Sequence, residues 1–250
     1  MNVQKARSAN RLLSLLSVRD YERLRPHLRK VKLKYKDSLY ESGKTIGAVY
    51  FLEEGVASNV IVMENGHSVE IGAIGNEGVV GLPIILGDTQ GTTSAYMQVP
   101  GEGLRMSAKL FWQQMESSKS LRLKILHYAH AYSNLLAQTG ACGHLHTLDQ
   151  RCCRWLLMTH DRVHNDQFLL TQEFLAMMLG VRRAGVTVAA DALRKAGLIE
   201  YSRGHVTILD YEGLRRRSCE CYDISKLEFD RLLGEKPMSA NKAKDIRRER

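Results

Sequence analysis

The segment from Thr171 to Leu209 constrains the fold more than any other part of the chain, because it predicts two short helices and a hairpin in a fixed order. Thr171 is a suitable N-cap for the first helix, and Gly180 is a suitable end, since glycine enters the left-handed region without a steric penalty. Ala176 is small enough for the second helix to cross closely. That second helix, which Gly197 closes, places small or apolar side chains on one face: Val186, Ala189, Ala190 and Leu193. This order is typical of a winged helix-turn-helix, and the alternative is an ordinary helical hairpin in a core.

The start of the second helix carries two arginines, Arg182 and Arg183, and no capping residue. A cation is unfavourable at this end of a helix, because the helix dipole is positive there. A DNA phosphate or base edge supplies the missing anion, so we interpret this helix as a recognition helix. We expect Arg183 to make a bidentate contact to guanine, with Thr187 and Val188 on neighbouring base edges or a thymine methyl group.

The hairpin that follows predicts the wing. Arg203-Gly204 marks its turn, and Val206 and Ile208 alternate on the return strand. Arg203 and His205 lie near the tip, where they either meet the phosphate backbone or form a solvated turn. The predicted DNA-binding set is Thr171, Gln172, Arg182, Arg183, Ala184, Gly185, Thr187, Val188, Arg203 and His205.

The composition is typical of a soluble globular protein. The 250 residues are 44% hydrophobic and 25% charged, as in globular proteins, and no apolar run has the length of a membrane span or signal peptide. We therefore expect a cytoplasmic protein. The net charge of +9 suits a polyanionic partner such as DNA. Part of that charge comes from the tail at residues 235–250, where scarce apolar residues predict disorder.

The first half of the chain predicts a different architecture. Residues 8–28 have a helical pattern with a joint at Val18-Arg19-Asp20, and short apolar runs separated by glycines follow from Val31 to about Met106. Such runs at near-regular spacing predict a compact antiparallel barrel or roll. Asn65-Gly66 predicts a two-residue hairpin turn between two of its strands.

A long helix is predicted from about Ser120 to His146, with a fresh helix after a hinge between His146 and Leu148. Residues along the long helix repeat at alternating steps of four and three, which is a heptad seam that usually pairs with a second chain. The alternative is a helix packed on its own barrel. The expected dimer seam is Leu121, Ile125, Tyr128, Tyr132 and Leu135. A second stripe contains Leu126, Ala129, Leu136, Gly140 and Gly143.

Together these segments predict an α+β protein with a β-roll or jelly-roll domain at residues 10–118 and a dimerisation helix at 119–146. The winged helix-turn-helix domain is expected at 147–214. A helical extension at 215–234 is expected to pack back on the motif, and the basic tail follows.

A glycine-punctuated roll, a long helix and a winged helix-turn-helix in this order resemble the Crp-Fnr family of bacterial transcription regulators, over roughly Asn10 to Leu214. The resemblance implies a cyclic-nucleotide-binding-type roll that acts as the effector domain and a Crp-type DNA-binding domain. It also implies a homodimer that binds double-stranded DNA and contacts RNA polymerase, with no membrane partner.

The chain departs from the family at the effector pocket. Many members bind a cyclic nucleotide with a Gly-Glu-Leu stretch and a later arginine, whereas Leu82 and Thr93 stand at the matching places here. A buried phosphate needs a cation or a ring of donors, so we expect no control by a cyclic nucleotide, no cofactor, and an unknown effector. The candidate pocket residues are Gly81, Leu82, Pro83, Thr92, Thr93 and Ser94. No cysteine precedes Cys142, which excludes the N-terminal iron-sulfur cluster of fumarate-nitrate-type members.

The recognition helix departs as well. Familiar members read DNA with an Arg-Glu pair and a second arginine on the next turn. Only Arg183 matches that pattern, while Ala184 and Val188 fill the other places. The target sequence should therefore differ from the best-known family site.

The five cysteines leave one alternative function open. His144-x-His146 lies close to Cys152-Cys153, whose adjacent side chains point to different helix faces. Cys219 and Cys221 are the better metal candidates, but two ligands do not close a tetrahedral site, so inert thiols and no metal are expected. The alternative is a redox- or metal-responsive regulator that uses Cys219 and Cys221, or one with an unknown small ligand in the roll. No helical His-Glu-x-x-His, nucleophile elbow or phosphate-cradling loop occurs, so we expect no enzyme.

Overall fold

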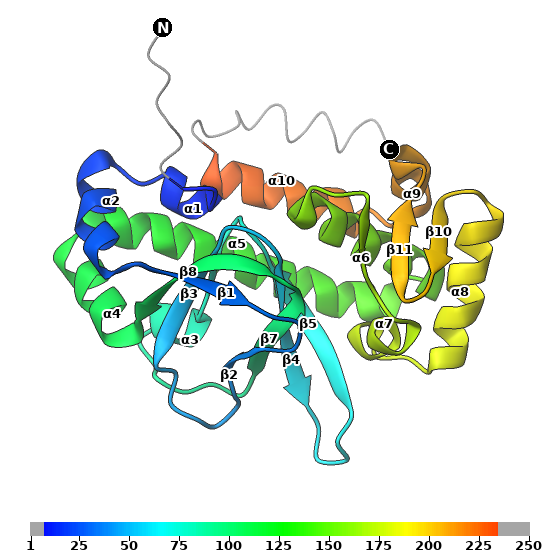
Figure 1. Cartoon of the computed structure of the whole chain (residues 1–250), viewed down its shortest axis with the longest axis horizontal. Helices are drawn as coiled ribbons and strands as arrows, with labels where there is room; N and C mark the ends of the chain where they lie inside the picture. The colour runs from blue at the N-terminus through cyan, green and yellow to red at the C-terminus, as the bar shows by residue number, and fades with distance from the viewer. Residues whose placement is uncertain (1–7, 235–250) are drawn as a thin grey trace, which may run out of the picture.

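The computed structural model of the chain describes residues 8–234, and the predicted disordered tail at 235–250 lies outside them. Helices account for 49% and strands for 23% of the structure, which confirms the predicted α+β class. Figure 1 shows the roll beneath the long helix, and the helix-turn-helix at one end of it. Among the residues that the structure describes, no helix combines the length and apolar character needed to cross a membrane.

Two short helices, α1 (Arg11–Ser14) and α2 (Val18–Leu24), and a 3-10 turn, η1 (Arg25–His27), open the described chain. The joint lies just before Val18 rather than at Val18-Arg19-Asp20, because the Ser17 side chain caps α2. Asn10 caps α1 and also donates its amide hydrogens to Leu52 O and Gly78 O, both at 2.8 Å. This buried asparagine therefore fastens the N-terminal helices to the roll.

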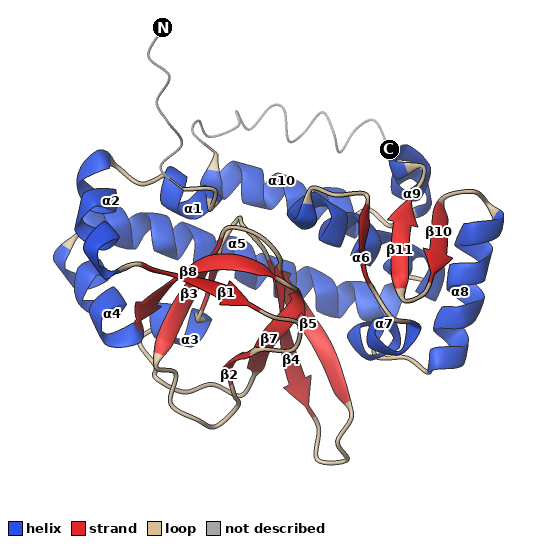
Figure 2. Ribbon diagram, viewed as in Figure 1, coloured by secondary structure: helices blue, strands red, loops and turns tan. Residues whose placement is uncertain are grey.

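The predicted roll is confirmed as two antiparallel four-stranded sheets, with strand orders β1-β8-β3-β6 and β2-β7-β4-β5 (Figure 2). Its elements are β1 (Arg29–Leu33), β2 (Ser38–Tyr40), β3 (Ala48–Leu52), β4 (Val56–Val62), β5 (Ser68–Ile74), β6 (Val79–Val80), α3 (Leu82–Ile85), β7 (Ser94–Val99) and β8 (Gly101–Ser107). The hairpin around Asn65-Gly66 joins β4 to β5 as predicted. Its loop is longer than two residues. The last pairing is the hydrogen bond from Met63 N to His67 O at 2.8 Å, and the residues between these two form the loop.

The long helix α5 (Lys119–Leu145) follows α4 (Ala108–Ser117) and ends where the sequence predicts. The expected pairing of its heptad seam with a second chain is corrected, because the structure buries all five seam residues within one chain: Leu121, Ile125, Tyr128, Tyr132 and Leu135. Tyr128 donates its hydroxyl hydrogen to Val79 O at 3.0 Å, and a Cβ at Gly78 would lie 2.1 Å from its ring. The alternative, a helix packed on its own roll, is therefore the arrangement observed.

After a two-residue break, the capping box of Thr147 and Gln150 starts α6 (Leu148–Val163). The remaining elements are β9 (Gln167–Leu169), α7 (Gln172–Leu179), α8 (Arg183–Lys195), β10 (Ile199–Ser202), β11 (His205–Ile208), α9 (Tyr211–Arg217) and α10 (Cys221–Leu233). The extension was expected to pack on the winged motif, and its first part does so: α9 packs on α6, and Tyr222 near the start of α10 lies in the core of the motif. Helix α10 runs along α5, because Phe229 and Leu233 join the core of the roll rather than that of the motif (Figure 1).

A buried ion pair joins the roll to the second domain. Arg162 of α6 lies 2.9 Å from Glu77 (Nε to Oε1), and the two side chains are 8% and 12% exposed. Arg162 also donates to Met158 O at 2.8 Å. The loop before β6 passes close to this arginine at Gly75, where an added Cβ would lie 2.7 Å from the arginine Cγ. Nearby, Trp155 donates to Glu70 at 3.0 Å, and burial raises the pKa of that carboxyl group.

We expect Glu77→Gln to lower the free energy of unfolding by about 3 kcal/mol, because it leaves a buried guanidinium without its counter-charge. The double variant Glu77→Leu, Arg162→Met should recover most of that loss, since no unpaired charge remains buried. Urea denaturation measures both. Glu228→Gln, which breaks the more exposed pair with Arg231, is the matched control and should change stability by less than about 1 kcal/mol. Equal losses in Glu77→Gln and the control would contradict this role.

Candidate nucleic-acid interface

The first helix of the motif, α7, begins and ends as its sequence predicts. The Thr171 hydroxyl accepts a hydrogen bond from Phe174 N at 3.1 Å, so the N-cap is formed. Gly180 adopts a φ of +62°, and the chain turns there with Val181 N donating to Ala176 O at 3.0 Å. Arg151 of α6 donates to Leu179 O and so satisfies a carbonyl at the end of α7. The turn is therefore fixed from both sides.

The second helix, α8, is held against α7 by its apolar face and by one polar contact. The predicted inward residues are all buried: Val186, Ala189, Ala190 and Leu193. Ala176 is buried on α7 as expected. Thr187 donates its hydroxyl hydrogen to Gln172 Oε1 at 2.9 Å, which links the outer edges of the two helices. The apolar packing therefore sets how α7 and α8 cross, and the hydrogen bond between Thr187 and Gln172 stabilises that crossing.

The outer surface of α8 has an unusual combination of groups. Arg182 occupies the N-cap position without a side-chain cap hydrogen bond, and both it and Arg183 are exposed. Val188 on the next turn is 71% exposed, although it is apolar. The one acid of α8, Asp191, pairs with Arg194 at 2.7 Å and Lys195 at 2.9 Å, and these bonds lower its pKa. The surface thus offers cations and an apolar group without a free carboxylate.

Two members of the predicted DNA-binding set have other roles in the fold. A Cβ at Gly185 would lie 3.1 Å from Leu148 Cδ2, so this residue faces α6, and its place in the DNA-binding set stays a prediction. Glycine allows α8 to lie close to the start of α6. The Thr187 hydroxyl is engaged by Gln172 and also lies 3.1 Å from Arg183 O, which leaves its methyl group as the outward part.

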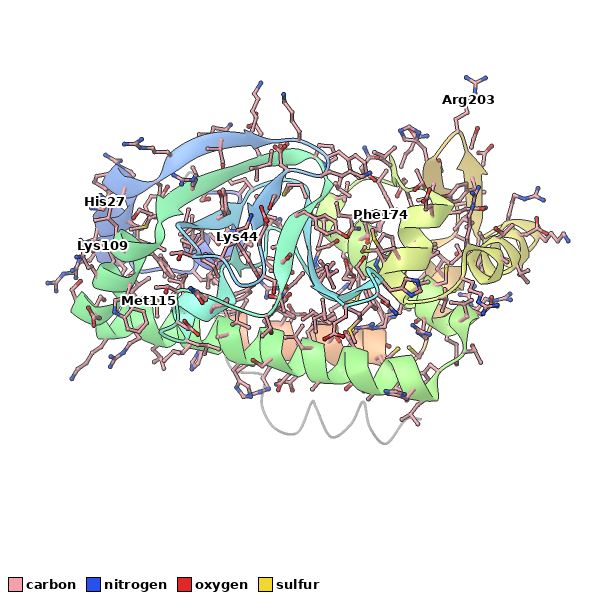
Figure 3. The ribbon with its side chains drawn as sticks, turned by 90° about the horizontal axis from the view of Figure 1, so that it is seen from below. His27, Lys44, Lys109, Met115, Phe174 and Arg203 are labelled. Atoms are coloured by element: carbon pink, nitrogen blue, oxygen red, sulfur yellow. The ribbon has the colours of Figure 1, made fainter. Side chains whose placement is uncertain are left out.

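The wing forms a three-stranded antiparallel sheet in which β11 lies between β10 and β9. Arg203 and Gly204 have φ values of +48° and +77°, which is the turn that matches the twist of a two-residue hairpin. Figure 3 shows Arg203 pointing away from the body of the molecule at the wing tip. His205 is also exposed beside it. Both residues therefore lie where the sequence placed them, on a rigid turn.

The roll touches the reading motif directly. Phe174 of α7 packs against Tyr35 and Tyr96 of the roll, with its ring centroid 6.1 and 6.4 Å from theirs. The turn of the motif lies on β5, since a Cβ at Gly180 would lie 3.0 Å from Val69 Cγ2. The first helix and the turn of the motif therefore contact the roll at β7 and β5.

The two candidate effector segments lie side by side in the roll. A Cβ at Gly91 would meet the Pro83 ring at 2.9 Å, which places residues 81–83 next to the loop before β7. The Thr93 and Tyr40 hydroxyls lie 3.1 Å apart, and the Ser94 hydroxyl accepts from Ser42 N at 3.0 Å. These hydroxyls already have partners in the chain, and Leu82 supplies no polar group.

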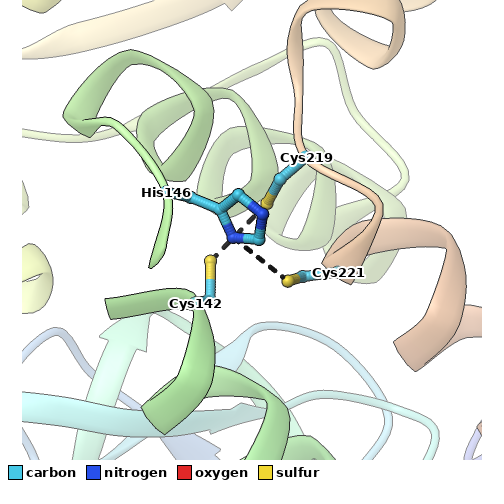
Figure 4. A group of neighbouring side chains, drawn as sticks. All are labelled: Cys142, His146, Cys219 and Cys221. Atoms are coloured by element: carbon cyan, nitrogen blue, oxygen red, sulfur yellow. Dashed lines mark hydrogen bonds between the residues drawn. The ribbon is translucent and has the colours of Figure 1, made fainter. Parts of the chain in front are cut away.

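The structure brings the two candidate cysteines together with two residues that the sequence did not connect with them. Cys219 and Cys221 lie beside Cys142 and His146, which stand at the end of α5 (Figure 4). The four donor atoms lie within 4.8 Å of one another. The signal in the sequence was the spacing of Cys142 and His146, which lie four residues apart at the end of the predicted long helix. Cys152 and Cys153 lie elsewhere, in the core of the motif, where burial raises the pKa of Cys153 to about 12.

Comparisons with known families agree with both halves of this architecture. Residues 30–118 match the cyclic nucleotide-binding domain, and residues 150–217 match the Crp-like helix-turn-helix domain. No curated protein matches the chain in sequence.

Several solved structures share the fold. FixK2 from Bradyrhizobium japonicum aligns with a TM-score of 0.66 at 11% identity over 77% of this chain and 98% of that one. A CRP-family regulator from Thermus thermophilus gives 0.61 at 19% identity, covering 75% and 96%. A crp/fnr-family regulator from Eubacterium rectale gives 0.58 at 18%, covering 80% and 94%. At such identities the likeness shows a common fold.

We expect Arg182→Asp to stabilise the protein by about 0.5–2 kcal/mol and to weaken its binding to duplex DNA. Aspartate caps a helix and suits its positive end, whereas the natural arginine does neither. Urea denaturation and fluorescence anisotropy with a labelled duplex measure the two effects. Arg19→Asp in the first turn of α2 makes the same charge change at the opposite end of the molecule and should leave DNA binding unchanged (Figure 1). Unaltered DNA binding by Arg182→Asp would remove this helix start from the interface.

Proposed function

Because this chain is a transcription regulator of the Crp/Fnr type, with a cyclic nucleotide-binding domain before a Crp-like helix-turn-helix, we propose that it binds a two-fold symmetric DNA site as a homodimer. The observation that carries the proposal is the outer surface of α8, whose uncapped start bears two exposed arginines. A phosphate or base edge is the anion that this surface lacks. The same chemistry supports a location in the bacterial cytoplasm, where the DNA lies.

Each outward group has a specific role in this proposal. Arg183 makes a bidentate contact to guanine, and Val188 and the methyl group of Thr187 contact thymine methyl groups in the major groove. Arg182 and the wing residue Arg203 contact phosphates, which position the motif without reading sequence. His205 and the N-terminus of α7, at Thr171 and Gln172, add phosphate contacts.

Dimerisation is proposed through a face of α5 that the roll and α10 leave open. The residues of this exposed stripe are Leu123, Leu126, His130, Ser133, Ala137, Gly140 and His144, which repeat at alternating steps of three and four. A shift of about two residues from the buried seam turns the stripe to the opposite side of the helix. Leu123 and Leu126 are 55% and 41% exposed and give the first part of this stripe an apolar surface.

The glycines near the end of α5 support the same proposal. An added Cβ at Gly140 or Gly143 would meet nothing within 4 Å, so no contact inside the chain requires glycine there. Glycine in a helix interior costs roughly 0.5–1 kcal/mol relative to alanine. Close approach of a second α5 explains why small residues stand at these places. Two recognition helices about 34 Å apart then enter successive major grooves of one site.

Control of DNA binding is proposed to be independent of a cyclic nucleotide. Leu82 and Thr93 lack the carboxylate and the cation that a ribose and a phosphate require, and Thr93 is engaged with Tyr40. Both matched domains are binding domains, which supports a function without catalysis. Contact with RNA polymerase stays a prediction from the family.

We expect selection from random duplexes to return a two-fold symmetric site, and Arg183→Ala to weaken binding to it by about 1–3 kcal/mol. The loss should be specific to one base position in each half-site, because Arg183 reads a base. Arg203→Ala is the matched comparison: it should weaken binding to all sequences equally and reduce the salt dependence by about one counterion. Salt-sensitive binding without sequence preference would overturn the proposal.

We expect the wild-type chain to sediment as a dimer and Gly140→Leu to sediment as a monomer, because leucine keeps the α5 stripes apart. Gln113→Leu places the same exposed leucine side chain on α4, away from the stripe, and should remain dimeric. Circular dichroism checks that both variants keep the helical content of the wild type. A dimeric Gly140→Leu would show that the partner does not meet this face of α5.

A further inference from the structure

Four potential metal ligands converge where α5 ends. Cys142 lies in the last turns of α5, His146 is its C-cap residue, Cys219 follows α9, and Cys221 begins α10. The three cysteines are buried, and the donor atoms of all four residues lie within 4.8 Å of one another (Figure 4). Two segments far apart in the chain thus each contribute a pair of ligands.

The spacing of the donors fits a single tetrahedral ion. The Sγ atoms of Cys142 and Cys219 are 3.5 Å apart, as are Cys221 Sγ and His146 Nδ1. Thiolates bound at about 2.3 Å to one tetrahedral ion lie roughly 3.8 Å from each other. An iron-sulfur cluster holds several irons and sulfides between its ligands and needs a wider ring. The compact set therefore favours one ion.

Groups around the four ligands have the arrangement that metal sites require. His146 presents Nδ1 to the cysteines, while its Nε2 lies 3.2 Å from Glu220 Oε2. A carboxylate on the far nitrogen fixes the ring and its tautomer, as it does for most metal-bound histidines. Gln138 donates to Cys221 Sγ at 3.0 Å, which stabilises a thiolate. These contacts point to a metal independently of the distances.

We propose that Cys142, His146, Cys219 and Cys221 bind one Zn²⁺ ion in a closed structural site. Three thiolates and an imidazole are soft and borderline ligands that select zinc over magnesium or calcium. Four protein ligands leave no open position for a substrate, so the site is structural. On binding, the thiols lose their S–H protons to solvent, His146 binds as the neutral ring, and the ion's charge does not change.

The proposed ion fastens the end of α5 to the segment between α9 and α10. His146 immediately precedes Thr147, the cap of the first helix of the DNA-binding domain. The site therefore sets the angle at which α6 leaves α5. The effect of the ion on DNA affinity is the one consequence that rests on the proposed function.

The first test is the metal content of the full-length protein purified under reducing conditions, measured by mass spectrometry. We expect one zinc per chain in the wild type and less than a tenth of that in Cys142→Ser and Cys219→Ser. Cys152→Ala and Cys153→Ala, which remove cysteines outside the cluster, are matched controls and should keep one zinc. Retention of zinc by Cys142→Ser and Cys219→Ser would overturn the assignment of these ligands.

A second test uses only the wild type, so that a variant that fails to fold does not decide the result. We expect a chelator to remove the zinc and lower the melting temperature. Re-addition of Zn²⁺ should release about three protons when the free thiols are protonated. Cobalt in place of zinc should give the absorption of a tetrahedral thiolate site.

Three outcomes would overturn the site: reduced wild-type protein that does not take up Zn²⁺, iron with acid-labile sulfide, or a Cys142–Cys219 disulfide that persists as the stable native form. Zinc uptake by a protein that binds no duplex would leave the site intact and count against the proposed function instead.

Discussion

The packing of α5 on the roll is the contact on which the rest of the structure depends. Tyr128 lies where any side chain at position 78 would stand, and its hydroxyl reaches Val79 O. Gly72 likewise admits Tyr132, since a Cβ there would lie 3.0 Å from the tyrosine hydroxyl. The two tyrosine side chains thereby occupy space that is free only because glycine has no side chain. This fixes the rotation of α5, and with it which face of the helix stays exposed.

The sequence predicted those parts of the fold whose signals are local. Thr171, Gly180 and Gly197 mark the ends of α7 and α8 through caps that act within one turn, and the inward face of α8 follows from three-four spacing. The seam of α5 was assigned to the wrong neighbour for a physical reason. Two stripes on that helix satisfy the same spacing, and only the tyrosines opposite glycines of the roll decide which one is buried.

Local sequence patterns could not predict that these cysteines and His146 cluster. Cys142 and Cys219 are 77 positions apart, and His146 and Cys221 are 75 apart. Their proximity follows from α10 returning along α5, and that path is set by Phe229 and Leu233 entering the core of the roll. Sequence patterns indicated the helical character of the extension but not the element it packs on. The sequence therefore indicated Cys219 and Cys221, and His146 in a different grouping, but it did not indicate Cys142 or the set of four.

The two surfaces proposed for partners share one property. Each contains a residue that lowers the stability of its helix, and no contact within the described chain compensates for that loss. An uncapped helix start costs about 1 kcal/mol, and each exposed glycine in a helix costs a little less. Arg182 leaves the start of α8 uncapped, and Gly140 and Gly143 are the exposed glycines of α5. Most other helices of the described chain do have a side-chain cap, among them those that follow Asn10, Ser17, Thr147 and Thr171. The arginine-bearing helix start and the open glycine face are therefore the two places that we propose a second molecule completes, DNA at the first and another copy of the chain at the second.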